Sequence, residues 1–262
     1  MLSEHRSGRL VAWGNAWLGG HTSLDTAAEQ ILLSGDEPHR VTGVPGESEH
    51  VSWTVALGRL RGVGAAGFRL ALPRPGDPLG LNGPAAFNHA AMTAGEAVLV
   101  IGAPFGIVPS ITPYGPPQDQ GQIVQWEVLP VDGPDSASAA VPTLSEAERE
   151  LAAAMREAAE ELIRLDVARW RPEIAESLAA IRGHGRAPDA VLAPGYPIRA
   201  IKVLTQAQRL AAIADLAAAD DGAAVSATQS RMRTSALTGL ERVTRRAQIA
   251  AYHAILEPSR DS

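Results

Sequence analysis

The stretch Glu96–Ile101, which reads EAVLVI, decides the fold that the sequence predicts. It lies between Gly95 and Gly102, and its last five residues are all apolar. A short, continuous apolar run of this kind is typical of a strand buried on both faces, as the strands of a parallel sheet are. We therefore predict a buried strand of a parallel sheet over these residues.

Patterns of strands and helices alternate on both sides of this run. Over Arg9–Leu18 apolar residues recur with period two, which predicts a first strand. The other predicted strands are His39–Val44, Phe68–Leu72 and Ile123–Val131, and the predicted helices are Ser23–Leu33, Ser52–Arg61 and Pro84–Thr93. Such alternation is the signature of βαβ units. The predicted fold class is α/β, with a mainly parallel sheet of about five strands and flanking helices.

A change of pattern after the last predicted strand indicates a second region. Residues 131–142, VDGPDSASAAVP, are small and polar, which is typical of a linker. Thr143 and Glu146 then have the spacing of a capping box at the start of a helix, as do Ser145 and Glu148. Later helices are predicted from Pro172 to Gly183, over Ile198–Ala219 and over Ser226–Leu256. We predict an α/β domain over residues 1–130, a linker over 131–142 and an all-helical domain over 143–262.

The composition excludes several chemistries and compartments. The chain has no cysteine among its 262 residues, which excludes disulfides, thiolate catalysis and cysteine-based metal sites. The N-terminus lacks the apolar segment of a secretory signal. The most apolar stretch, Ala97–Pro109, is interrupted by glycine and proline and falls short of the ~20 residues that a membrane helix needs. We therefore predict a cytoplasmic protein that does not associate with a membrane.

The charge of the chain argues against nucleic acid as a partner. The formal net charge is −6, so the overall field does not attract a phosphate backbone. The last predicted helix is locally basic, but Tyr252 is the only aromatic residue close to its arginines. These arginines are Arg231, Arg233, Arg242, Arg245 and Arg246. We interpret them as a solvated face that pairs with the acidic first helix of the same region, and we predict no nucleic-acid partner.

No motif in the sequence assigns a catalytic chemistry. Gly62, Gly64 and Gly67 have the spacing of a dinucleotide-binding loop, but this loop leaves a helix and enters a strand. Pyrophosphate binding needs the reverse order, so we interpret the glycines as a helix-to-strand turn. A phosphate-binding lysine loop, a nucleophile elbow and a helical histidine pair are all missing. We predict no cofactor and no metal, and catalytic residues and enzymatic activity stay unassigned.

The predicted strand order suggests one place for a small-molecule ligand. In open parallel sheets, ligands bind beyond the carboxyl ends of the strands. Gly/Pro-rich loops follow the first four predicted strands, so a parallel sheet would gather them on one rim. The candidate ligand-binding residues of these loops are His21, Ser23, Glu47, Arg74 and Asp77. His21 would act as acid or base, oriented by Asp77; in the alternative, the loops are tight turns and Ser23 is a helix cap.

The helical region suggests a different function. Its apolar stripe from Leu144 to Leu165 needs facing helices along its whole length, and any uncovered part would mark a partner site. This predicts a homodimer through the helical region; the competing outcome is a helical packing closed within one chain. The favoured function is therefore a cytosolic interaction or scaffold protein that uses its helical half. The alternative is a small-molecule-binding protein or enzyme with its site on the rim loops.

Four segments of the chain resemble one protein family. They are GNAWLGG (residues 14–20), PGDPLGL (75–81), LDVARWRPE (165–173) and DDGAAVSA (220–227). Together they resemble a family of uncharacterised proteins from high-GC actinobacteria, and the resemblance spans most of the chain. It implies a full-length cytosolic protein and brings no activity, ligand or catalytic residue with it.

Overall fold

The computed structural model describes residues 5–32, 38–81, 83–116, 121–131, 141–164, 192–219 and 227–257. The chain divides into two compact units. Among the described residues, the α/β unit takes in those up to 141, together with 192–197 and 252–257. The helical unit takes in 142–164, 198–219 and 227–251. Two short segments from late in the sequence therefore complete the unit that the first half of the chain builds.

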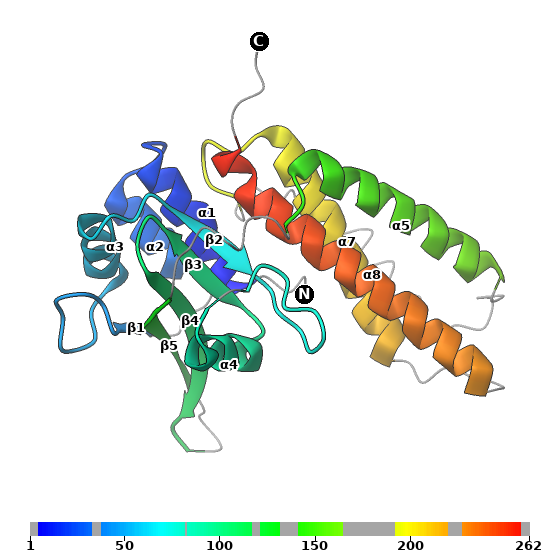
Figure 1. Ribbon diagram of the computed structural model, residues 1–262, viewed down its shortest axis with the longest axis horizontal. Helices are drawn as coiled ribbons and strands as arrows, with labels where there is room; N and C mark the ends of the chain where they lie inside the picture. The colour runs from blue at the N-terminus through cyan, green and yellow to red at the C-terminus, as the bar shows by residue number, and fades with distance from the viewer. Residues whose placement is uncertain are drawn as a thin grey trace, which may run out of the picture. The chain divides into compact units, whose positions relative to one another are not determined.

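A five-stranded sheet forms the centre of the α/β unit, and it is mixed rather than mainly parallel (Figure 1). Its strands are β1 (His39–Thr42), β2 (Gly67–Ala71), β3 (Ala97–Ile101), β4 (Phe105–Tyr114) and β5 (Gly121–Pro130), in the order β1-β5-β4-β3-β2. Within the described residues, only β1 and β5 pair parallel. The predicted mainly parallel sheet is wrong, because residues 102–104 alone join β3 to β4 and a parallel crossover needs about a dozen residues.

The predicted first strand is also wrong, because Arg9–Leu18 belongs to a helix, α1 (Arg6–Leu18). Residues 7–17 are all buried, so this part of the helix has no face exposed to solvent. A helix that is buried on all sides needs no apolar stripe of period 3.6, so the sequence pattern does not reveal it. Its apolar residues fit a buried strand equally well, and the period-two pattern was therefore not diagnostic.

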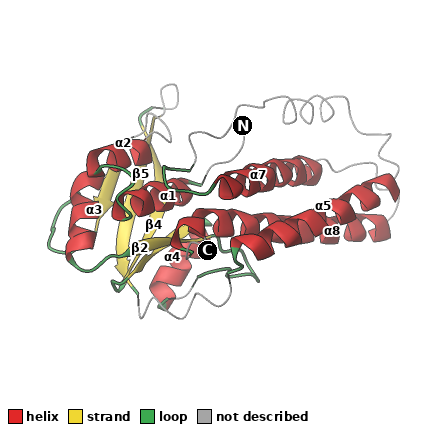
Figure 2. Cartoon of the chain, turned by 90° about the horizontal axis from the view of Figure 1, so that it is seen from above, coloured by secondary structure: helices red, strands yellow, loops and turns green. Residues whose placement is uncertain are grey.

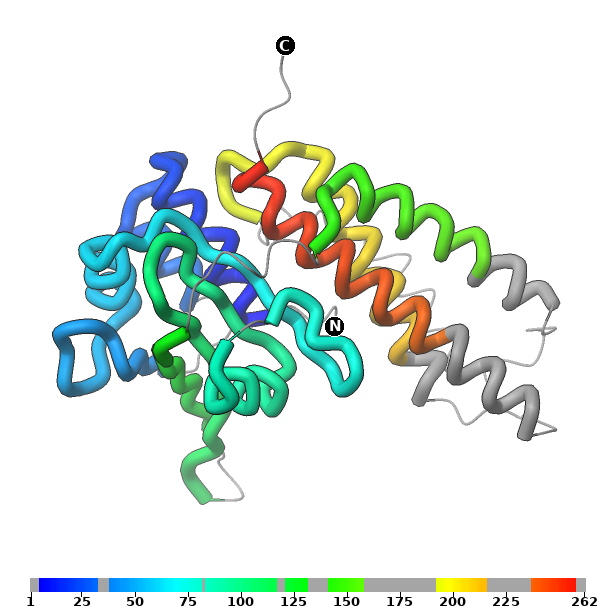
Figure 3. Tube along the Cα trace, viewed as in Figure 1, coloured from blue at the N-terminus to red at the C-terminus, as the bar shows by residue number. Residues whose placement is uncertain are grey.

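The sequence prediction also missed β4, which contains Pro109 and Pro113. Pro109 is paired with Trp126 of β5, and Pro113 is paired with Gln122. Both β5 residues are two positions from Val124, so their backbone N–H groups point to the same side of the strand as that of Val124. The backbone N–H of Val124 points away from β4 and donates to Pro38 O at 3.0 Å. The nitrogens of the two prolines likewise point away from β5, so the ladder loses no hydrogen bond there. The β4–β5 ribbon runs out beyond its neighbouring strands in Figure 3.

The remaining helices of the α/β unit agree with the predicted segments and cover both faces of the sheet. They are α2 (Leu24–Leu32), α3 (Trp53–Gly62) and α4 (Ala85–Ala94). On one face, Phe87 of α4 packs with Leu99 and Val108 in one hydrophobic cluster. On the other face, Trp53 of α3 meets Trp126 of β5 edge-on, with ring centroids 5.0 Å apart. Large apolar side chains therefore hold helices on both sides of the sheet.

Three helices make up the described part of the helical unit and lie side by side (Figures 1 and 2). They are α5 (Leu144–Arg164), α7 (Ile198–Ala219) and α8 (Ala227–His253), and a 3₁₀ turn, η3 (Ala254–Leu256), follows α8. The predicted helix over Ile198–Ala219 is confirmed, whereas the one predicted from Pro172 to Gly183 lies outside the described residues. No helix in the described ranges combines the length and apolar character that crossing a bilayer requires.

Candidate functional site

The structure separates the residues that the predicted rim was meant to gather. The pairing directions make β1, β3 and β5 run one way and β2 and β4 the other. The loop after β1, with Glu47, therefore lies at the opposite end of the sheet from the loop after β2, with Arg74 and Asp77. His21 follows the end of α1 that contacts the start of β2, so it is also far from Asp77. The arrangement in which Asp77 orients His21 does not form.

Ser23 and Glu47 hold local structure together. The hydroxyl of Ser23 accepts a hydrogen bond from Thr26 N at 3.1 Å and donates to Thr26 Oγ1 at 2.8 Å. Ser23 is therefore a helix cap for α2, as the alternative interpretation predicted. The carboxylate of Glu47 accepts a hydrogen bond from Arg59 Nε at 2.7 Å.

Arg74, Asp77 and His21 also have structural partners. Arg74 and Asp77 exchange two backbone hydrogen bonds of 2.9 Å around a two-residue turn. Gly76 in that turn has a φ of +81°, which favours glycine. The guanidinium of Arg74 donates to Gly95 O at 3.2 Å. The ring of His21 lies directly against Gly195. The five predicted ligand-binding residues thus contribute to turns, caps and packing, and they do not converge on one site.

A cluster of polar groups that the sequence prediction missed lies at the outer edge of β2. The side-chain amide of Asn15 donates to Phe68 O at 2.9 Å, and Phe68 N donates to Asn15 Oδ1 at 2.7 Å. Two residues further along, Leu70 N donates to Nε2 of His253 at 2.7 Å. The one signal for this cluster in the sequence was a polar Asn15 inside an apolar run, and the error over Arg9–Leu18 concealed it.

The pKa values of His253 and of the nearby Tyr196 are both shifted so that the neutral form is favoured. Burial and, to a smaller extent, the positive charge of Arg69 together lower the pKa of His253 to about 3. Burial also raises the pKa of the Tyr196 phenol, whose hydroxyl donates to Tyr252 O at 2.8 Å. Shifted pKa values often mark catalytic groups. Here both side chains bond to backbone atoms, so the cluster acts as an edge cover of the sheet.

Glu96, the first residue of the EAVLVI run, has a structural partner as well. Its carboxylate accepts a hydrogen bond from Ser7 N at 2.7 Å, in the first turn of α1. Burial raises the pKa of this carboxyl group, and the bond to Ser7 and the charge of Arg6 oppose that rise. A carboxylate at a helix N-terminus satisfies an unpaired N–H and complements the helix dipole. Glu96 therefore caps α1 from a distant part of the sequence.

Apolar side chains between the three helices are buried at one end of the helical unit, which we call the closed end, and only partly buried at the other. Contacts of Glu148 with Arg199 and of Glu150 with Arg246 set the three helices against one another. At that end the inward-facing residues are buried: Leu144, Ala147, Leu151, Ala200, Val203, Leu204, Ala207, Ala247 and Ala251.

Further along the same stripes, apolar side chains become only half-buried. The residues are Ala154, Met155, Leu210, Ala211, Leu237 and Leu240, and we call them the far-end patch. Ala214 is a buried exception on α7. Since these residues continue the stripes of the closed end, their partial exposure means that the described helices do not fully cover them.

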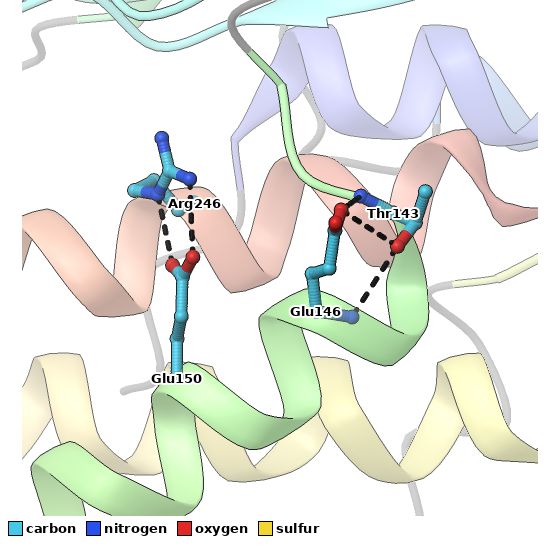
Figure 4. Close-up of polar contacts among 4 residues, drawn as sticks. All are labelled: Thr143, Glu146, Glu150 and Arg246. Atoms are coloured by element: carbon cyan, nitrogen blue, oxygen red, sulfur yellow. Dashed lines mark hydrogen bonds and ion pairs between the residues drawn. The ribbon is translucent and has the colours of Figure 1, made fainter.

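Charged side chains tie the closed end together (Figure 4). Arg246 of α8 donates to both carboxylate oxygens of Glu150 on α5, at 3.0 and 3.2 Å. Thr143 N and Oγ1 donate to Glu146 Oε2 at 2.9 and 2.8 Å, and Glu146 N donates back to Thr143 Oγ1 at 3.3 Å. These bonds lower the pKa of Glu146. The predicted capping box and the predicted pairing of Arg246 with the acidic first helix are thus both present.

Two family models match the chain in sequence. The Rv1486c-like protein N-terminal domain matches residues 7–141, and the Rv1486c-like protein C-terminal domain matches residues 145–249. The chain belongs to the Rv1486c-like family. The resemblance to an uncharacterised actinobacterial family is therefore confirmed. No solved structure matches the chain.

Proteins from several mycobacteria resemble the chain over nearly its whole length. Uncharacterized protein Rv1486c of Mycobacterium tuberculosis is 30% identical over 288 residues, covering 94% of this chain and 96% of the relative. Uncharacterized proteins of Mycobacterium avium and Mycobacterium leprae are each 28% identical with the same coverage. The described residues of this family member contain no group of three or more histidines, aspartates or glutamates placed to hold a metal ion.

Proposed function

We propose that this member of the Rv1486c-like family is a cytoplasmic interaction protein that forms a homodimer through the far-end patch of its helical unit. One observation carries the proposal, namely the loss of burial along continuous apolar stripes. Val203 is buried, whereas Leu210, two turns further along the same face of the helix, is half-buried. The corresponding change on α8 lies between Ala247 and Leu240.

The energetics of apolar surface support association at this patch. Burying apolar surface is worth about 25 cal/mol per Å², so a facing helix would gain free energy from each half-exposed side chain. Contiguous apolar surface on a soluble protein commonly marks a partner site. The polar residues first proposed for a ligand have structural partners, which favours the interaction function over a rim-loop enzyme.

Sedimentation velocity over a range of protein concentrations tests the proposal. We expect a reversible dimer for the native chain. Leu237→Glu in the far-end patch should give a folded monomer, because a carboxylate at a desolvated contact is costly.

Ile198→Glu is the matched control. Ile198 is 72% exposed and begins α7 at the closed end, so this change should leave the dimer intact. A native chain that stays monomeric, or a dimer that Leu237→Glu does not weaken, would contradict association through the far-end patch.

A further inference from the structure

Two side chains of different chemistry hydrogen-bond to the backbone at the outer edge of β2, and we call them fasteners. At Phe68 the fastener is the amide of Asn15, which bonds both the N–H and the C=O of the backbone. At Leu70 it is the imidazole of His253, which accepts one hydrogen bond at Nε2. An amide does not titrate in the ordinary pH range, whereas an imidazole does.

The inner edge of β2 does not depend on either fastener. All five residues of the strand, Gly67–Ala71, pair with β3 in one antiparallel register. If the His253 contact opens, this ladder keeps the strand in place. Opening would therefore be local, confined to the turn that contains His253 and to the amide of Leu70.

His253 can hold Leu70 only while its Nε2 is unprotonated. The backbone N–H needs the lone pair of this nitrogen, and a proton there would set two donors against each other. We propose that His253 is an acid-sensitive fastener, whose protonation releases the turn His253–Leu256 from the edge of β2 while Asn15 keeps the Phe68 end closed. The proposal does not depend on the proposed dimer.

The surroundings of His253 oppose its protonation in the closed state. Arg69, on β2, is the charged residue that acts on the ring, and its positive charge disfavours the imidazolium. Of the two nearby tyrosines, Tyr196 donates its hydroxyl to Tyr252 O and has a pKa that burial raises, and Tyr252 is fully buried. A proton is therefore taken up when the contact opens and the ring leaves the Leu70 N–H and the charge of Arg69.

The neighbouring residue Tyr252 limits how far the opening spreads. Its ring lies against Gly8 of α1 so closely that a Cβ at Gly8 would lie 2.6 Å from it. Glu96, which bonds Ser7 N beside this packing, also titrates, but burial raises the pKa of its carboxyl group, so proton uptake there stabilises the folded unit and does not release it. The release thus begins after Tyr252, at His253, and the rest of the α/β unit stays folded.

Linkage gives the size of the effect. The pKa of His253 is about 3 when the turn is closed, and an exposed histidine has a pKa of about 6.5. In the pH range between these two pKa values, His253 is protonated in the open state and unprotonated in the closed state. The equilibrium constant for opening therefore rises about 25-fold when the pH falls from 7 to 5.

Residue-resolved amide hydrogen exchange of the whole chain tests this proposal. Protection factors, which correct for the intrinsic effect of pH on exchange, are compared at pH 7 and pH 5. We expect the protection of the Leu70 amide to fall about 25-fold, while that of the Phe68 amide stays nearly constant. The two amides lie in one strand, so Phe68 is an internal reference within the same sample.

His253→Gln is the matched variant, because its side chain offers an acceptor that does not titrate. In this variant the Leu70 amide should lose its pH dependence, whatever its protection at pH 7. Equal losses at Phe68 and Leu70 would mean global acid unfolding and would overturn the proposal. So would a Leu70 protection that is the same at both pH values in the native chain.

Discussion

Helices α1 and α3 each contain two glycines, which are closely packed against other side chains in α1 and have no close neighbours in α3. In α1, a Cβ at Gly14 would lie 2.7 Å from the ring of Phe68, so the missing side chain makes room for a neighbour. In α3, a Cβ at Gly58 or Gly62 would meet nothing within 4 Å. Glycine costs helical stability in both places. Close packing compensates this cost at Gly14 in α1, whereas Gly58 and Gly62 in α3 make no close contact that would compensate it.

The two helices also begin differently. The first turn of α3 is capped by the residue that directly precedes the helix, since Ser52 accepts a hydrogen bond from Val55 N at 3.5 Å. The first turn of α1 is capped by Glu96, which is far away in the sequence. Helix α3 is thus specified locally, whereas α1 depends on residues from several parts of the chain.

The largest expected effect concerns the polar residue inside α1. Asn15→Leu leaves the buried N–H and C=O of Phe68 without a partner, and we expect a loss of about 3 kcal/mol in the free energy of unfolding. Arg61→Ala in α3 is the control. Arg61 is exposed and lies over the ring of Trp17, so its loss should cost about 0.5–1 kcal/mol at most. Urea denaturation measures both, and equal losses would break the comparison.

Glycine replacement in α1 gives the next largest effect. Gly14→Ala forces a methyl group against Phe68, and overpacking of this kind costs about 1–3 kcal/mol. Better helix propensity returns up to about 1 kcal/mol, so we expect a net destabilisation of about 1–2 kcal/mol. The midpoint of urea denaturation should fall with an unchanged slope. A variant as stable as the native chain would show that the contact with Phe68 relaxes without cost.

The same replacement in α3 should have the opposite sign. Gly58→Ala adds a methyl group in open space and lowers the entropy of the unfolded chain. We expect a stabilisation of about 0.5–1 kcal/mol. A destabilised Gly58→Ala variant would mean that something covers this face of α3 in solution, which analytical sedimentation would then reveal.

The smallest expected effect is a change of pH dependence at the cap of α1. Burial raises the pKa of Glu96, so the folded chain binds a proton there more readily than the unfolded chain. Between neutral pH and the ordinary carboxyl pKa of 4.5, this group therefore adds stability as the pH falls. In Glu96→Gln the amide oxygen can still accept from Ser7 N, but the pH dependence is lost. The variant should exceed the native chain in stability by more at pH 7 than at pH 5.

Local signals in the sequence predicted helices α2, α3 and α7 well, but not α1. Ser23 and Ser52 are caps that act within three residues, and the bounds of α7 follow from one continuous pattern. Strand direction has no such local signal. Apolar alternation is the same in parallel and antiparallel strands, and the short connection after Ile101 was interpreted as a ligand loop because Pro109 and Pro113 hid the strand that follows.

The candidate sites also differ in whether their residues lie close together in the sequence. The capping box of Thr143 and Glu146 was predictable because its partners lie three residues apart. The edge cover of β2 was not, because Asn15 and His253 come from opposite ends of the chain and neither belongs to a motif. The rim site failed for a third reason, since it depended on a strand direction that the sequence does not encode locally.

The late segments of the α/β unit have a consequence for the order in which a ribosome makes it. All five strands have been translated by Pro130, but the ring that packs on Gly8 belongs to Tyr252 and the acceptor for the Leu70 amide to His253. The unit therefore reaches its final state only when nearly the whole chain has left the exit tunnel. A nascent or truncated chain that stops at Val141 keeps the whole sheet but exposes an unfinished edge, and such edges recruit strands from other chains.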